Sequence, residues 1–328
     1  MTLVDPSLSD HAGRADPDRL SAAPDRLAAA HSRVFVLAGA AIAAVAVAVR
    51  WAGGWDVNTG ATLPVLAAVA LIAGLPHGAL DPWISHRAGL WRGVSGFVRW
   101  HAIYVAIAAA VVVAFLVAPS LALFGFLALS VYHFSGDWNG EEAGFRALPR
   151  GLRLVAATTV VIVPSVAHPE AVATIFAAIM RSAPPAGPID LPYGIMLPTL
   201  WLLAGTIGAA WWIDRRAGLE IAVVVALAVA LPPLAFFLAY FAGLHSPRYM
   251  LRERDAVPGG RAMLGVLFYT LLALGLCAGV TVWAFGGELE ALASGADGEV
   301  LRAVFIGLAA LTLPHVLLVE RASHGYRS

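Results

Sequence analysis

The chain has 328 residues, of which 60% are hydrophobic and only 13% are charged, and its mean hydropathy is +0.79. Soluble proteins carry about 25% charged residues, so this composition excludes a soluble globular protein and predicts an all-α, polytopic bundle of transmembrane helices. The net charge of zero gives no support to a nucleic-acid partner. Because all 21 basic residues are arginine and a Schiff base needs a lysine amine, the chain is not a retinal-binding rhodopsin.

The N-terminal segment, residues 1–33, is rich in Asp, Arg, Ala, Ser and Pro and has no sustained apolar run. It predicts a disordered cytoplasmic tail ahead of a membrane domain over residues 34–328. A secretory signal is not expected, because that signal needs an apolar stretch near the start of the chain.

Beyond the tail, apolar segments close to the ~20 residues that a bilayer core requires alternate with short polar loops. The predicted spans are 34–50, 62–80, 99–118, 120–138, 152–167, 194–213, 219–246, 262–286 and 300–320. The apolar stretch at 168–181 is too short to assign, and a thin crossing, a re-entrant piece and a surface helix all remain open.

The distribution of arginine predicts the orientation, because short cytoplasmic loops carry an excess of basic residues. The arginines group in the tail and in the loops near residues 87–99, 146–153 and 248–261. Nine simple crossings would place the last group outside. We therefore infer one miscounted element between residues 153 and 246, eight to ten membrane helices, and both termini on the cytoplasmic side of the cell membrane.

Four of the ten histidines lie inside or at the end of predicted spans: His77 in "LPHGALD", His133 in "VYHFSGDW", His245 in "GLHSPRY" and His315 in "LPHVLLVE". The predicted topology places all four toward the cytoplasmic half of the membrane, where they can converge. A polar residue in a membrane span usually faces a partner inside the protein and marks a functional site.

Two of these histidines have an aspartate four residues later, Asp81 after His77 and Asp137 after His133. Residues at i and i+4 share one helix face, and a carboxylate that accepts one imidazole N–H leaves the other nitrogen to bind a metal. The pattern predicts a polyhistidine metal centre in which each aspartate orients the histidine of its own motif. Imidazole suits Zn, Cu, Fe and Ni, and an apolar substrate from the bilayer with dioxygen as co-substrate favours iron(II).

Other interpretations fit parts of the pattern. Any one of these histidines can be an ordinary hydrogen-bonding group in a helix bundle. A b-type haem protein would use paired histidines on facing helices, and an ion or proton transporter would use deep His and Asp residues as a relay. Neither accounts for the repeated spacing of His and Asp, and no inverted repeat typical of transporters is visible.

The quoted motifs resemble those of the Brp/Blh family of bacterial and archaeal membrane β-carotene 15,15'-dioxygenases, over residues 62 to 320. The resemblance implies a multi-helix bundle and an iron(II) centre held by histidines. It also implies cleavage of the central double bond of all-trans-β-carotene with dioxygen, which gives two retinal molecules for a rhodopsin.

By position, His77, His133 and His245 match the family histidines that hold the iron. The family pattern His-Ser-x-Arg-His has Tyr249 in place of its second histidine here, so the fourth coordination position is open to three assignments: His315, the Tyr249 phenolate, or no protein ligand. The same departure leaves open a diverged member that cleaves another carotenoid or has lost activity.

Aromatic residues lie next to the candidate ligands in the sequence and are candidates for the wall of an apolar groove that holds the polyene. They are Tyr132, Phe134, Phe236, Phe237, Tyr240 and Phe241. Ordinary packing in the bundle explains them equally well.

Overall fold

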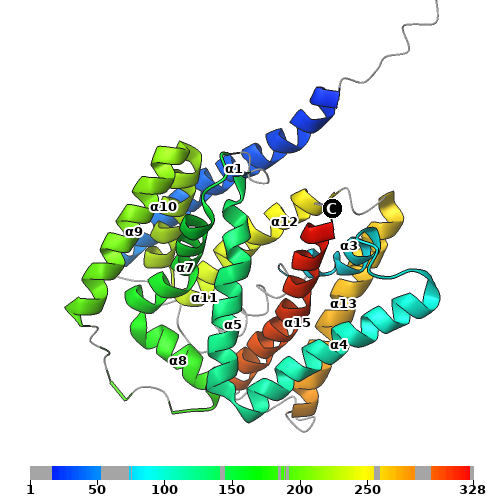
Figure 1. Ribbon diagram of the computed structural model, residues 1–328. Coiled ribbons are helices and arrows are strands. Elements are labelled where there is room, and N and C mark those ends of the chain that lie inside the picture. Colours follow the sequence, from blue (N-terminus) through cyan, green and yellow to red (C-terminus); the bar gives the residue numbers. More distant parts are fainter. Residues whose placement is uncertain are drawn as a thin grey trace, which may run out of the picture.

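The computed structural model describes residues 17–52, 74, 76–140, 145–183, 186–187, 189, 192–254, 259–284 and 297–325. These residues form helices and no strand (Figure 1), which confirms the predicted all-α class. In chain order the helices are α1 (Pro17–Trp51), α3 (Asp81–Arg87), α4 (Gly93–Val117), α5 (Pro119–Phe134), η2 (Ser135–Trp138), α7 (Arg150–Ala167), α8 (Pro169–Met180), α9 (Tyr193–Ile213), α10 (Arg215–Ala230), α11 (Pro233–Tyr240), η3 (Phe241–His245), α12 (Ser246–Glu253), α13 (Gly259–Ala284) and α15 (Asp297–Gly325).

Six helices of the described part are long and apolar enough to cross a membrane, which makes the chain a polytopic membrane protein. They lie within α1, α4, α5 with η2, α7, α9 and α15. Residues 62–73 and 75 of the predicted span 62–80 lie outside the described residues. The side of the membrane on which each terminus lies remains a prediction.

The helices pack in two groups that meet at the centre of the molecule (Figure 1). In the first group, α10 packs against α1, α7 and α9, and its small residues Ala217, Gly218 and Ala228 let these helices approach closely. In the second group, α15 packs against α4, α5, α8 and α13. Helices α11 and α12 run between the two groups (Figure 1), and the short η3 joins them.

The predicted single span 219–246 is wrong, because α10 ends at Ala230 and a new helix begins at Pro233. Proline has no backbone N–H and forces the residue before it out of the helical region. Leu231 accordingly has an extended backbone (φ −101°, ψ 147°) ahead of the Pro232–Pro233 pair. The break separates the run that carries His245 from α10.

The predicted disordered tail also differs from the structure, because α1 begins at Pro17 and makes residues 17–33 helical. Ala28, Ala29 and Ser32 are buried along this part of the helix. This part of the helix is buried through small residues, so the sequence has no long apolar run there to indicate a helix. The prediction of a disordered segment differs from the structure for this reason. Residues 1–16 of the predicted tail lie outside the described residues.

The ambiguous stretch 168–181 forms the 12-residue helix α8. At 1.5 Å per residue such a helix spans about 18 Å, less than the ~30 Å hydrocarbon core, so it does not cross a bilayer by itself. Ile175 and Ile179 of α8 are buried in the core shared with α15.

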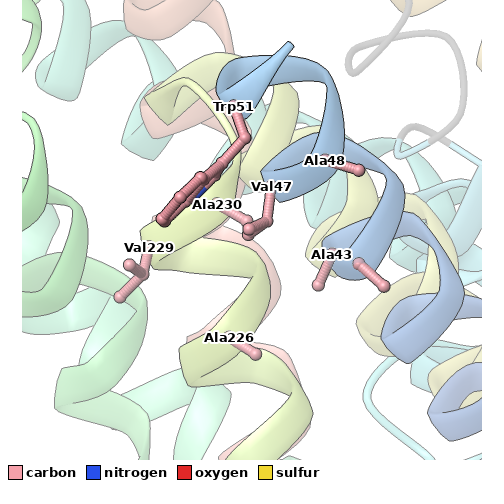
Figure 2. A pocket seen from close by; sticks show the side chains of 8 residues that line it. Ala43, Val47, Ala48, Trp51, Ala226, Val229 and Ala230 are labelled. Carbon is pink, nitrogen blue, oxygen red and sulfur yellow. The ribbon is translucent and has the colours of Figure 1, made fainter.

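An apolar groove on the outside of the bundle lies between α1 and α10 (Figure 2). Val47, Trp51 and Val229 are among its lining residues, and none of the four candidate histidines is. The groove is therefore separate from the candidate site.

Candidate metal centre

Four imidazoles meet in a ring: His133 of α5, His245 of η3, His315 of α15, and His77 from the segment just before α3. The ring centroid of His133 lies 4.7 Å from that of His245 and 5.1 Å from that of His315. The ring centroid of His77 lies 5.3 Å from that of His245 and 5.1 Å from that of His315. Each of these four contacts is edge-to-face, with interplanar angles of 76°, 88°, 79° and 89° in that order. The structure thus brings together all four histidines that the sequence singled out.

One pair of ring nitrogens in this quartet is spaced as two ligands of one ion would be, and the others lie near it. His133 Nε2 and His245 Nε2 are 3.1 Å apart, and His77, His133 and His315 each offer a nitrogen within 4.8 Å of the others. Two nitrogens bound at about 2.1 Å to one ion lie about 3.0 to 3.4 Å apart in right-angled or tetrahedral geometry. His315 Nε2 is buried without a hydrogen-bond partner among the described residues, which suits an atom that binds an ion.

The segment around His77 is shaped by a glycine. His77 Nδ1 is hydrogen-bonded to the Gly74 carbonyl oxygen. Because a carbonyl oxygen can only accept, Nδ1 carries the proton and Nε2 is unprotonated and able to bind a metal. A Cβ atom on Gly74 would collide with the Phe241 ring, which itself packs edge-on against His77 at 5.3 Å. Only glycine allows this close approach.

His245 and His315 lie where their helices depart from regular geometry. His245 ends the π-helical turn η3, a local widening that is common at functional sites. His315 follows Pro314 inside α15, where proline removes a backbone hydrogen bond of the helix. Both imidazoles therefore come from irregular turns of their helices.

The predicted pairing of histidines and aspartates is wrong, although both aspartates do contact a histidine of the centre. Asp81 Oδ1 accepts from His315 Nδ1 at 2.8 Å, and Asp137 accepts from His245 Nδ1 at 3.0 and 3.1 Å. Each carboxylate therefore orients a histidine of another element and not the one in its own motif.

The reason is that both motifs run across a helix end. His133 lies in the last turn of α5, whereas Asp137 belongs to the 3₁₀ helix η2. Between His77 and Asp81 the chain makes a turn before α3 begins. The rule that residues four apart share a face holds only within one continuous α-helix.

Each carboxylate also accepts a hydrogen bond from a tyrosine. Tyr104 donates to Asp81 Oδ2 at 2.8 Å, and Tyr240 donates to Asp137 Oδ2 at 2.6 Å. Sequence reasoning considered Tyr240 only as a groove residue and missed Tyr104, which lies in the middle of the apolar helix α4 without a local motif. Both carboxylates are buried, and with a histidine and a tyrosine as donors each is hydrogen-bonded and fixed in direction.

A buried ion pair lies behind Asp137. Arg248 binds Glu220 through two hydrogen bonds of 2.9 and 2.6 Å, and it donates a third, 2.6 Å long, to the backbone carbonyl of Asp137. Burial alone would lower the pKa of the Arg248 guanidinium, but the Glu220 carboxylate outweighs burial and holds that pKa above its ordinary value. The sequence signal for this pair was the acidic residue within the apolar run of α10, since such a residue in a membrane protein calls for a partner.

Tyr249 packs at the edge of the quartet. Its ring centroid lies 5.0 Å from that of His315 and 5.6 Å from that of His77. The guanidinium of Arg252 lies over the same ring, with Cζ 4.5 Å from the centroid. The Tyr249 ring thus contacts two of the four imidazoles. That the Tyr249 phenolate is a metal ligand remains a prediction.

The aromatic residues proposed for a groove surround the centre. Phe241 stacks on His245 with a centroid distance of 5.5 Å, and Phe134 packs edge-on against the same ring at 4.8 Å. Phe237 continues the row from Phe241, whereas Phe236 and Tyr240 are fully buried. Tyr132 is partly exposed one residue before His133. Among the four histidines only His133 is partly exposed, whereas His77, His245 and His315 are buried.

The geometry argues against the haem alternative. A porphyrin with two axial histidines lies between their nitrogens, and the 3.1 Å from His133 Nε2 to His245 Nε2 leaves no room for it. The cluster of four imidazoles instead suits a single metal ion.

The fold and this centre define a class: a multi-pass helical membrane protein with a buried cluster of histidines supported by carboxylates. A model of the β-carotene 15,15'-dioxygenase family matches residues 67–321. A β-carotene 15,15'-dioxygenase from the uncultured marine bacterium 66A03 is 27% identical over 272 residues, which cover 77% of this chain and 91% of that protein. The chain therefore belongs to the β-carotene 15,15'-dioxygenase family. No solved structure matches it.

Proposed function

We propose that the protein cleaves the central 15,15' double bond of β-carotene with dioxygen and that His77, His133, His245 and His315 hold the iron(II) required. The observation that carries the proposal is the convergence of these imidazoles, with the Nε2 atoms of His133 and His245 3.1 Å apart. The name of the bacterial relative supports the substrate.

The reaction breaks one carbon–carbon double bond and forms two aldehyde carbonyls, so each retinal product takes one of the two oxygen atoms. Iron(II), when bound, would supply the activation of dioxygen that this reaction needs. Since the chain contains no lysine, it cannot retain retinal as a lysine Schiff base. The product is therefore free to leave, and a rhodopsin is the acceptor that we propose.

The residues of the chain do three things in this proposal. Asp81 and Asp137 accept the Nδ1–H groups of His315 and His245, which fixes the tautomer and leaves each Nε2 able to bind the ion. Phe134 and Phe241 exclude water from the centre. The partly exposed side of His133 is where an apolar polyene and dioxygen would enter from the membrane lipid.

A purified sample tests the proposal directly. Metal analysis should find about one iron per chain, and anaerobic incubation with β-carotene followed by air should release two retinals for each carotene consumed. His77→Ala and His133→Ala should remove both iron and turnover, whereas His86→Ala, which changes an exposed histidine outside the quartet, should keep them. Full iron content in both quartet variants would disprove the centre.

Cleavage of another carotenoid is a second candidate, favoured by Tyr249 at the position of a family histidine and next to His315 and His77. A panel of carotenoids with different end groups separates the two. Faster turnover of another carotenoid, with products of a different length or end group, would replace β-carotene as the substrate.

A further inference from the structure

Helix α1 approaches the segment that carries His245. It packs against both η3 and α12, and Phe35 of α1 lies 3.6 Å from the position that a Cβ on Gly243 would take. The family model begins at residue 67, so this contact comes from a part of the chain outside the family match.

Two consecutive residues of α1 make polar contacts there. His31 Nε2 lies 2.9 Å from the carbonyl oxygen of Gly243, so this nitrogen is the donor. Ser32 Oγ donates to Glu220 Oε2 at 2.7 Å. Gly243 lies in the π-helical turn two residues before His245.

The second contact continues to the other side of His245. Glu220 binds Arg248, three residues after His245, and Arg248 donates to the Asp137 carbonyl oxygen. The Asp137 carboxylate in turn accepts from His245 Nδ1. His31 and Ser32 are therefore connected to both flanks of the same imidazole and to the carboxylate that orients it.

We propose that His31 and Ser32 are positioning residues for the metal centre: they hold the turn that carries His245 so that its Nε2 faces the other three imidazoles. The inference rests on the proposed role of His245 as a ligand. It extends the centre beyond the family region, because α1 fixes a ligand that the family region supplies.

Cobalt(II) binding to the purified full-length protein tests this inference, because its visible absorption bands report the coordination geometry without turnover. His31→Leu and Ser32→Ala remove the two contacts. His31→Gln and Ser32→Thr keep a donor at each position. Residues that touch ligands directly change metal affinity by about 10- to 100-fold, so the more distant His31→Leu and Ser32→Ala should each weaken cobalt binding by about 3- to 10-fold and alter its spectrum. The conservative variants should restore both.

Matched controls separate positioning from ordinary packing. His168→Leu removes a histidine contact of the same kind, from Nε2 to the Ala228 carbonyl, and Ser165→Ala removes a hydroxyl that bonds the Val161 carbonyl of its own helix. Neither should change cobalt affinity or spectrum. Thermal unfolding of the metal-free proteins measures any general loss of stability.

Two results would overturn the inference in distinguishable ways. If His245→Ala impairs cobalt binding while His31→Leu and Ser32→Ala lower only the thermal stability, α1 is a packing helix and the metal centre stands. If His245→Ala binds cobalt as the wild type does, the proposed ligand set fails and the inference fails with it.

Discussion

Replacing Asp137 with asparagine should weaken metal binding through His245. In the structure Asp137 accepts from His245 Nδ1 at 3.0 and 3.1 Å and from the Tyr240 hydroxyl at 2.6 Å. Asparagine keeps one carbonyl oxygen without the negative charge and places an NH₂ group at the other position, so His245 Nδ1 loses its hydrogen bond to a charged acceptor.

The expected magnitude follows from the kind of bond that is lost. A hydrogen bond to a charged group contributes about 1.5 to 3 kcal/mol, and 1.4 kcal/mol corresponds to a factor of ten in affinity. Asp137→Asn should therefore lower the affinity for iron(II) or cobalt(II) by about 10- to 100-fold, which is the usual effect of a changed carboxylate behind a ligating histidine. Asp214→Asn is the control, because Asp214 caps α10 and accepts from the backbone N–H of Arg146, away from the quartet.

Nitrogen NMR of protein labelled at histidine identifies which imidazole responds. We expect the His245 ring nitrogens to shift in Asp137→Asn while those of His133 stay in place, and we expect Asp81→Asn to shift His315 and not His77. If Asp137→Asn shifted only the His133 nitrogens, the pairing seen in the structure would be refuted, and each aspartate would instead pair with the histidine of its own motif. Unchanged affinity would refute the supporting role of the carboxylate.

Three further predictions follow from the surroundings of the quartet. Tyr240→Phe removes one donor to the Asp137 carboxylate. It should weaken cobalt binding by about 2- to 10-fold, which is less than the effect of Asp137→Asn. A larger effect than that of Asp137→Asn in the same titration would contradict the prediction. Gly74→Ala should disturb the centre because the added methyl group collides with Phe241, and Phe241→Leu in the same chain should restore cobalt affinity in part; normal affinity of Gly74→Ala alone would disprove the constraint. Tyr249→His should leave iron affinity unchanged or slow turnover if His315 is the fourth ligand, whereas higher affinity together with tolerance of His315→Ala would show that the fourth position was weakly held. A visible charge-transfer band of the ferric protein that disappears in Tyr249→Phe would instead identify the phenolate as a ligand.

The fold class and the four histidines could be predicted from the sequence because each rests on a local signal. Long apolar segments predict membrane helices wherever they fold, and a histidine in such a segment is costly unless it has a partner. The break at Pro232–Pro233 carried a local signal as well, but the apolar run on both sides concealed it.

The partners of the aspartates could not be predicted, because they depend on contacts between elements far apart in the chain. Tyr104 reaches Asp81 across 23 positions, and His315 reaches the same carboxylate across 234. A spacing rule describes only neighbours on one helix. The contribution of residues 17–33 was missed for a related reason, since the burial of small residues such as Ala28 depends on helices that come much later in the chain.

The exchanged pairing has a consequence for how the centre is held together. The segment with His77 and Asp81 supplies one imidazole and orients that of α15, while the end of α5 with η2 supplies His133 and orients that of η3. Each motif thus fixes a ligand from a different part of the chain, so the orientation of two ligands depends on how separate elements pack. Pairing within a motif would fix each histidine only relative to its own helix. The exchanged arrangement joins η2 to η3 and the start of α3 to α15, which couples assembly of the bundle to formation of the metal centre.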